Sequence, residues 1–413
     1  YWFFEIRSLG GAIIMMSLVL YPYVYLLARA AFLEQSVSSI EVGCSLGYSR
    51  WQALWKLALP MARPAIIAGL SLALMETLAD YGTVQYYGVS TFTTGIFRTF
   101  YGYGDTAAAA QLAASLLAFV ILLVLLERYS RRRARYHSAA ESRARADLIP
   151  LSGSKAIMAC VICFSPLMFG FIIPATQLLL WAVFEAEPLG WDFVGLAWNS
   201  FSLAFLAAII AVILAIILSY AKRTKPIKPV RTVLAMAGFG YALPGTIIAI
   251  GVLIPLAWLD HRLIDIFGSL GWDSPGLLLS GSLVALLFAY TVRFLAVALG
   301  SVQSGLEKIK PSLDHVGRSM GHSPLDILRK IHVPLMRSSI LTAVLIVFVD
   351  VLKELPATLI LRPFNFNTMA VRAYELASDE RLVDAAPASI MIVLVGLIPV
   401  LMLHASIARR RPH

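Results

Sequence analysis

The chain of 413 residues is strongly apolar, with 59% hydrophobic residues and a mean hydropathy of +0.78. This composition excludes an ordinary soluble globular protein, because the apolar residues form runs long enough to cross a bilayer. The net charge of +10 does not indicate a nucleic-acid partner, since the Lys and Arg residues cluster at the ends of the apolar runs, as the positive-inside rule expects.

Taken in chain order, windows of about 20 apolar residues predict nine membrane spans. The predicted spans are 10–29, 62–82, 106–126, 155–184, 199–220, 231–258, 277–303, 338–356 and 385–406. Basic segments mark the cytoplasmic side, and segments with few Lys or Arg lie outside. The basic segments are 128–135, 222–231 and 409–411, and the outer ones are 83–105, 185–198, 259–276 and 357–384. The pattern predicts an all-α, multi-pass protein of the inner (plasma) membrane.

The three cysteines do not predict a metal site. Cys160 and Cys163 have the C-x-x-C spacing, but they lie inside an apolar run that offers no further ligands. Cys44 has no nearby partner in the sequence. We therefore expect all three to be small buried hydrophobic side chains.

One segment of the sequence occurs twice. Residues that are 274 positions apart agree without a gap over about 75 positions. The matched pairs include Gly43/Gly317, Ser45/Ser319, Gly47/Gly321, Ser49/Ser323, Leu54/Leu328, Lys56/Lys330, Pro60/Pro334, Arg63/Arg337, Leu78/Leu352, Thr94/Thr368, Arg98/Arg372, Asp105/Asp379 and Ser115/Ser389. Agreement of this length indicates a duplication.

The duplication predicts the domain organisation. A first half at 1–126 contains its repeated loop at about 30–63, a basic cytoplasmic linker covers 127–154, and a second half at 155–413 contains its loop at about 304–337. The second half has three spans before the one that leads into its loop, whereas the first half has none. We therefore expect the first half to be N-terminally incomplete and to lack three of six spans.

Each repeated loop has the pattern of a helix, a sharp turn and a second helix. In the first copy, Gly47 suits a left-handed helix end, and Ser49 with Gln52 forms a capping box for the next helix. In the second copy, Gly321 has the same place, Ser323 is the cap, Pro324 is the first helical residue and Asp326 lies in the first turn. Pro60 and Pro334 close the two loops.

This spacing resembles the EAA loop of ABC importer permeases, in which the loop forms a coupling helix that docks on the ATP-binding subunit. The resemblance implies ATPase-coupling roles for Glu41, Gly43, Gly47, Ser49 and Pro60, and for His315, Gly317, Gly321, Ser323 and Pro334. The acidic position of the first copy, Glu41, is His315 in the second, so the two ATPase contacts are expected to differ. The sequence contains no phosphate-binding G-x-x-x-x-G-K-[ST] loop, which places ATP and Mg²⁺ in a partner subunit and predicts that this chain is not itself an enzyme.

Four carboxylates fall within predicted spans, where a charge costs about 3 kcal/mol on insertion scales. Glu76 and Asp80 share one helix face, and Asp350 and Glu354 occupy the matching positions of the second copy. Oxygen ligands suit hard cations, so these four side chains are candidates for a substrate pathway and for metal contacts. The alternative reading is that some of them form structural ion pairs.

Two stretches resemble the ferric iron ABC transporter permeases. They are 353–375, beginning Lys353-Glu354-Leu355-Pro356, and 79–89, beginning Ala79-Asp80-Tyr81-Gly82. The resemblance implies the type I (MetI-like) fold with two homologous halves, Fe³⁺ as the transported substrate, a periplasmic iron-binding protein and two copies of an ATPase, with no cofactor in this chain. Thiamine permeases are similar in length and duplication and remain an alternative. An ion-coupled secondary transporter is a second alternative, since carboxylates within the membrane also bind protons or sodium.

Overall fold

The computed structural model describes residues 5–34, 43–132, 151–274 and 276–408. Helices are the only regular secondary structure in these ranges. Among the described residues, seven helices are long and apolar enough to cross a membrane: Leu9–Leu33, Arg50–Ala79, Thr106–Glu127, Ser154–Glu185, Trp191–Thr224, Gly245–Ser269 and Leu283–Glu307. An eighth crossing is the bent pair Pro324–Leu335 and Arg337–Leu352, if the pair is counted as one span. The prediction of an all-helical, multi-pass membrane protein is confirmed.

The chain divides into two compact units. The first contains residues 1–94 and 114–177, and the second contains 95–113 and 178–413. These units do not coincide with the halves expected from the duplication, because residues 155–177 cluster with the first unit and 95–113 with the second.

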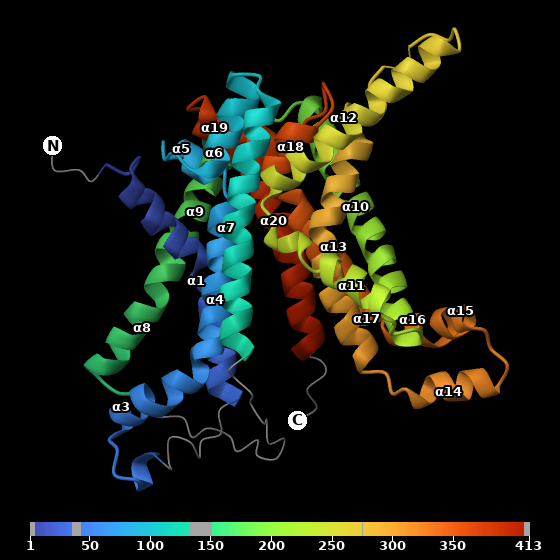
Figure 1. Cartoon of the computed structure of the whole chain (residues 1–413). Coiled ribbons are helices and arrows are strands. Elements are labelled where there is room, and N and C mark those ends of the chain that lie inside the picture. The colour runs from blue at the N-terminus through green and yellow to red at the C-terminus, as the bar shows by residue number, and fades with distance from the viewer. Residues whose placement is uncertain (1–4, 35–42, 133–150, 275, 409–413) are drawn as a thin grey trace. The chain divides into compact units, whose positions relative to one another are not determined.

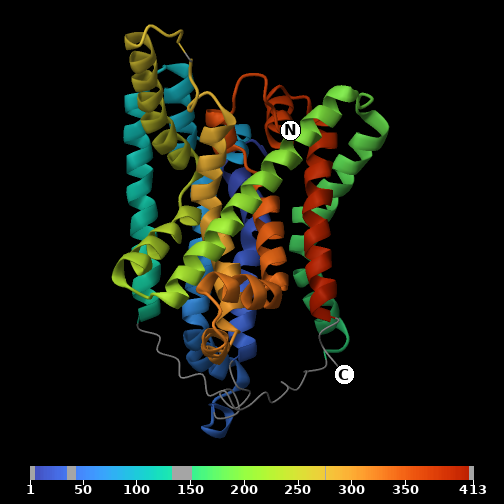
Figure 2. The same cartoon turned by 90° about the vertical axis from the view of Figure 1, so that its right-hand side faces the viewer.

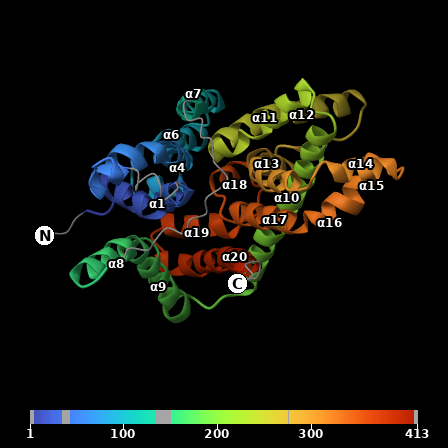
Figure 3. The same cartoon turned by 90° about the horizontal axis from the view of Figure 1, so that it is seen from below.

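The first unit is built on two helices that lie side by side, α1 (Leu9–Glu34) and α4 (Leu59–Ala79) (Figures 1 and 3). Gly69 allows their close approach, since a Cβ at this position would lie 2.7 Å from the Cα of Val24. The π-helical turn η3 (Met168–Ile172) packs on the same helix, with Gly170 against the carbonyl of Leu18. Small residues at helix contacts are the usual means of packing helices within a bilayer.

The second unit has a core of three helices: α10 (Trp191–Thr224), α13 (Leu283–Glu307) and α17 (Arg337–Leu352). Figure 2 shows α10 running obliquely across α13 and α17. The packed face of α10 consists mainly of small residues that are buried, including Ala204, Ala207, Ala208, Ala211 and Ala215. Close helix packing in this unit therefore follows from alanine at helical spacing.

The predicted span 231–258 is not one continuous helix. Helix α11 (Lys228–Ala237) ends at Gly238, a 3₁₀ turn follows at Gly240–Ala242, and α12 (Gly245–Ser269) begins after Pro244. Gly240 packs so closely on the carbonyl of Val292 that no side chain fits there. The helix is thus broken where glycine and proline permit close backbone contact, and α12 extends beyond the predicted end of the span.

The local structure repeats at the offset of 274 residues. Helices α3 (Arg50–Ala53) and α15 (Pro324–Ile327) correspond residue for residue, as do the π-helical turns η1 (Leu54–Ala58) and η6 (Leu328–His332). Helix α1 begins at Leu9 and α13 begins at Leu283. The short helices after the bends, α5 (Gly82–Tyr86) and α18 (Pro356–Leu361), match in the same way.

The remaining elements complete the two units. They are α6 (Phe92–Phe97), η2 (Arg98–Gly102), α7 (Thr106–Arg132), α8 (Ser154–Leu167), α9 (Ile173–Leu180), η4 (Trp181–Glu185), α14 (Ser312–Ser319), α16 (Val333–Leu335), α19 (Met369–Ser378) and α20 (Leu382–Ala408). Within the second unit, α20 packs on α19 and η4, so that the outer segments meet the last span.

The expectation that the cysteines are buried is wrong. Cys44, Cys160 and Cys163 are all exposed, and no residue of α8, which contains the last two, is buried by the rest of the chain. The physical reason is that lipid tails are as apolar as a protein core, so a hydrophobic side chain on a membrane helix has no need of a protein partner.

Gly245 offers a direct test of the packing at the break. A Cβ at Gly245 would collide with the guanidinium of Arg293 and the carboxylate of Glu354, whereas Gly251, one helical turn and a half further along α12, has open space around it. We expect Gly245→Ala to lower the free energy of unfolding by on the order of 1–3 kcal/mol. Gly251→Ala is the matched control and should be neutral or slightly stabilising. Thermal unfolding of the purified chain in detergent micelles measures both, and equal midpoints for the two variants would contradict the close packing.

Candidate functional site

The two repeated loops have the predicted local structure. Gly47 and Gly321 adopt left-handed backbone conformations, with φ of +87° and +80°. Ser49 caps α3 by accepting from the N–H of Gln52, and Ser323 caps α15 by accepting from the N–H of Asp326, and in each case the second residue's side chain accepts from the cap's own N–H. These capping and turn predictions are confirmed. Glu41, the acidic position of the first loop, lies outside the described residues.

Two further glycines hold the arms of each hairpin together. A Cβ at Gly317 would lie 2.9 Å from Cγ1 of Ile327, and a Cβ at Gly43 would lie 2.7 Å from Cδ1 of Leu57. Pro60 and Pro334 lie in the helices that follow, at the second position of α4 and of α16. His315 is exposed on α14. The glycine positions singled out by the repeat therefore have a packing role in both copies.

Both hairpins present large apolar side chains to their surroundings. The first exposes Leu46, Trp51 and Trp55, and the second exposes Val316, Met320 and Leu325. Figure 1 shows α14 and α15 of the second hairpin beyond the ends of α13 and α17. Exposed apolar side chains at the tip of a polar hairpin are typical of a surface that docks on another protein.

An arginine on α10 holds the second hairpin in place. Arg223 donates to the carboxylate of Asp314 from Nε at 2.9 Å and from Nη2 at 2.6 Å. The same guanidinium donates to the carbonyls of Leu306 at 2.7 Å and Ile309 at 2.9 Å, at the end of α13. One side chain thus ties together the span α10, the end of the span α13 and the first turn of α14.

Two aromatic side chains complete this clamp. His332 is fully buried, and its Nε2 lies 3.0 Å from Oδ1 of Asp314. The ring of Tyr220 lies 5.4 Å from the ring of His332, and its hydroxyl donates to the carbonyl of Pro324 at 2.6 Å. We call Arg223, Asp314, His332 and Tyr220 the hairpin clamp.

The hairpin clamp was not predicted from the sequence. Asp314 and His332 correspond by the repeat to Ile40 and Ala58, so the duplication gave no reason to select them. The sequence offered only a weak signal: Arg223 is a basic residue at the end of a predicted span, and Asp314 is an acidic residue next to His315, 91 residues further along. The second hairpin is thus held by a charged contact that the repeat did not reveal.

The clamp predicts a strong energetic coupling between two side chains. Arg223→Gln removes one partner of a largely buried pair and should destabilise the chain by about 3 kcal/mol, because Asp314 is left uncompensated. Arg223→Gln combined with Asp314→Asn should restore part of this loss, since two neutral polar groups tolerate burial better than one charge. Unfolding midpoints of the single and double variants give the coupling. Lys222→Gln, an exposed neighbour, is the control, and additive effects of Arg223→Gln and Asp314→Asn would contradict the clamp.

The carboxylate of Glu354 is buried and fully engaged. It accepts from Nη1 of Arg293 at 2.7 Å and from the backbone N–H groups of Ala357 and Thr358, both at 3.1 Å. The hydroxyl of Thr358 also donates to it, at 3.0 Å, and Thr358 pairs in turn with the hydroxyl of Tyr290. Glu354 is therefore the N-terminal anchor of α18 as well as the partner of Arg293.

The other carboxylates differ in their surroundings. Asp350 lies 3.1 Å from the ammonium of Lys353, one turn along. Asp80 accepts from the hydroxyl of Thr83 and the N–H of Val84, both at 3.0 Å, and so anchors α5 as Glu354 anchors α18. Glu76 is half-buried on α4.

The structural ion pair weighed from the sequence is present for Glu354 and for Asp350. Arg293 has no counterpart in the first copy, where the position 274 residues earlier is Val19. The described residues contain no group of three or more His, Cys, Asp or Glu side chains arranged to hold a metal ion. Whether the four carboxylates form a pathway or metal contacts stays a prediction.

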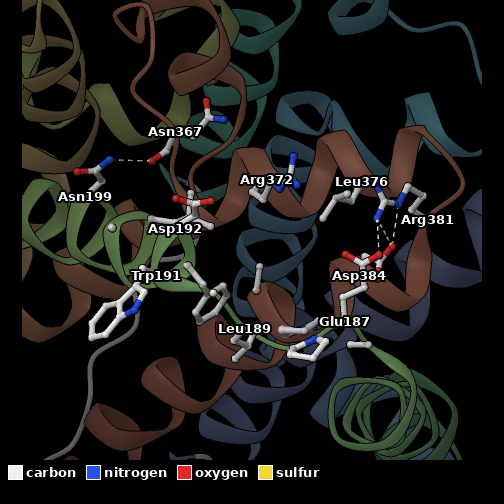
Figure 4. A pocket seen from close by; sticks show the side chains of 18 of the residues that line it. Glu187, Leu189, Trp191, Asp192, Asn199, Asn367, Arg372, Leu376, Arg381 and Asp384 are labelled. Atoms are coloured by element: carbon white, nitrogen blue, oxygen red, sulfur yellow. Dashed lines mark hydrogen bonds and ion pairs between the residues drawn. The ribbon is translucent and has the colours of Figure 1, made fainter.

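Two of the predicted outer segments meet at a pocket of the second unit. The pocket has a volume of about 710 Å³ and lies between the start of α10, the loop at 365–367, α19 and the start of α20 (Figure 4). Arg381 lies on one side of it, 2.7 Å from Asp384 and 3.8 Å from Glu187, and Asn199 donates to the carbonyl of Asn367 on the other. The hydrogen bond to Asp384 raises the pKa of Arg381 above its ordinary value. The pocket is a polar hollow on the side that the charge pattern places outside.

Comparison with known proteins gives the family context. Residues 4–136 match the family described as "Binding-protein-dependent transport system inner membrane component". The chain is 26% identical over 405 residues to the "Fe(3+)-transport system permease protein FbpB 2" of Haemophilus influenzae, covering 97% of this chain and 77% of that protein. It is 22% identical over 408 residues to the "Ferric transport system permease protein FbpB" of Actinobacillus pleuropneumoniae, covering 94% of this chain and 57% of that protein.

A third relative covers only part of the chain. The "Putative 2-aminoethylphosphonate transport system permease protein PhnV" of Salmonella typhimurium is 24% identical over 208 residues, which is 49% of this chain and 72% of that protein. Relatives with different substrates in their names thus match all or part of this chain.

Proposed function

We propose that this chain, a multi-pass inner-membrane protein with a domain of the binding-protein-dependent transport system inner membrane component family at residues 4–136, is the permease of an ATP-driven ferric iron importer. The names of the two long relatives support ferric iron as the cargo. The family description supports partnership with a periplasmic binding protein and an ATP-binding subunit.

The observation that carries the proposal is the repeated hairpin. Two hairpins with the same cap, the same left-handed glycine and exposed apolar tips suit two docking sites, one for each of two ATPase copies. Because the sequence lacks a phosphate-binding loop, ATP and Mg²⁺ are bound by those partners. A secondary transporter needs no such pair of docking elements.

The contacts of the second hairpin suggest how ATP drives transport. Closure of the ATPase pair moves the hairpin, and the hairpin clamp passes this movement to α10 and α13 together, since Arg223 bonds to both the hairpin and the end of α13. Rigid transmission of this kind is how a docking element biases a bundle between outward- and inward-facing states.

The proposed cargo path uses the carboxylates. Glu354 is held by Arg293 and by α18, so a passing cation competes with an arginine there. Asp350 pairs instead with the exposed ammonium of Lys353, which leaves its carboxylate more available. Asp350 is therefore the stronger candidate for cargo contact in the second half.

Coupling is tested at Gly321. Its φ of +80° strains any β-branched residue, whereas asparagine tolerates that conformation. We expect Gly321→Val to reduce iron uptake and ATPase co-purification at least tenfold and Gly321→Asn to retain most of both. Uptake by cells and pull-down of the ATPase measure the two effects. Wild-type uptake and co-purification for the valine variant would show that the hairpin is not the docking element.

The cargo is tested by uptake of labelled ferric iron in competition with thiamine and 2-aminoethylphosphonate. We expect excess unlabelled ferric iron alone to compete. Asp350→Asn should lower iron uptake at least tenfold if the carboxylate meets the cargo, while Lys353→Gln should keep it near the wild-type level. Equal losses in both variants would reduce Asp350 to a structural ion pair, and competition by thiamine would replace iron as the cargo.

A further inference from the structure

A basic hollow lies at the base of the second hairpin, apart from the hairpin tip. It has a volume of about 790 Å³ and is bounded by the end of α13, the turn that leads into α14, and the start of α17. Its polar lining comes from Lys308, Lys310, Arg337, Ser312, Ser338 and Ser339. Three cationic residues, two from the turn at 308–310 and one from the start of α17, therefore line one hollow in the second unit.

The cations of this hollow have no acidic partner among the described residues. No Asp or Glu lines it, and within the described part of the chain Lys308, Lys310 and Arg337 form no ion pair with a carboxylate. Asp314 pairs with Arg223 and Asp326 with Lys330, and Glu307, which precedes Lys308, is exposed and does not line the hollow. Like charges held together in this way create a positive potential that attracts an anion.

The backbone adds to this potential. Ser312 is the first residue of α14, and Arg337 is the first residue of α17, so both helices begin at the hollow. At α14 the N–H groups of Leu313 and Asp314 already donate to the carbonyls of Lys310 and Pro311, so the two helix starts contribute the positive ends of their dipoles. Serine hydroxyls beside them are suitable donors to phosphate oxygens.

The position of the hollow and the apolar residues at its rim favour a lipid headgroup over a free anion as its ligand. The span Leu283–Glu307 ends immediately before Lys308, which places the cations at the level of the headgroups on the side assigned to the cytoplasm. Leu313 and Leu335 also line the hollow and are 38% and 59% exposed. A free phosphate gains nothing from these leucines, whereas a phospholipid places acyl chain against them.

We propose that this basic hollow binds the phosphate headgroup of an anionic phospholipid of the cytoplasmic leaflet. Basic pockets between membrane helices on this side bind such headgroups by the same combination of charge and depth. The inference does not depend on the cargo. It applies to the second copy only, because the positions that match Lys308 and Lys310 are Glu34 and Ser36 in the first.

The test measures phosphatidylglycerol bound to the full chain in detergent micelles, by native mass spectrometry, with phosphatidylcholine as the comparison lipid. The triple variant Lys308→Gln, Lys310→Gln, Arg337→Gln should weaken phosphatidylglycerol binding by on the order of 100-fold, at about fivefold for each charge removed. The matched control Lys222→Gln, Lys225→Gln, Lys228→Gln removes three charges at the same membrane level and should leave binding at this site unchanged.

The outcomes separate the sources of the anion. Lys308→Gln alone, at an exposed position, keeps the test valid if the triple variant does not fold, and it should weaken binding about fivefold. Equal losses in the triple variant and its control would overturn the site. Displacement of the lipid by millimolar inorganic phosphate would assign the hollow to free phosphate and overturn the lipid proposal. Unchanged lipid binding with loss of ATPase co-purification would assign it to an acidic segment of the ATPase instead.

Discussion

The second unit depends on how it accommodates the charge of Glu354. Only 4% of this residue is exposed, so its carboxylate has no access to water and must be satisfied by the chain itself. Arg293 neutralises the charge from α13, and the first N–H groups of α18 supply the remaining donors. Gly245 must lack a side chain to leave room for the pair, which fixes the start of α12. Three helices therefore take their positions from one buried carboxylate.

The two copies share backbone geometry more closely than they share charge. Caps, left-handed glycines and π-helical turns recur at the same offset. Three ionisable residues of the second copy do not recur, since Val19, Ala58 and Glu34 stand where the second copy has Arg293, His332 and Lys308. The described caps and turns of the two hairpins are thus alike, while the charged contacts of the second copy use residues that the first copy lacks at the matching positions.

The features that the sequence predicted correctly depend on residues close together in the chain, and those it missed depend on residues far apart. Capping boxes and glycine turns depend on residues three or four positions apart, and those predictions are confirmed in both copies. The pairs Arg293–Glu354 and Arg223–Asp314 join residues 61 and 91 positions apart, and no local pattern identifies them. The break before α12 was partly predictable. Hydropathy alone gave one span, although the sequence contains Gly240 and Pro244 within it.

The four carboxylates of the two copies differ in their hydrogen-bond partners. Their matched spacing suggested one role. A carboxylate that accepts hydrogen bonds from backbone N–H groups, however, has fewer lone pairs free to bind a cation. Asp80 and Glu354 are caps, whereas Glu76 and Asp350 lie one turn earlier and do not cap the short helices. In each copy, then, the second carboxylate anchors the short helix that follows the span, and the first does not.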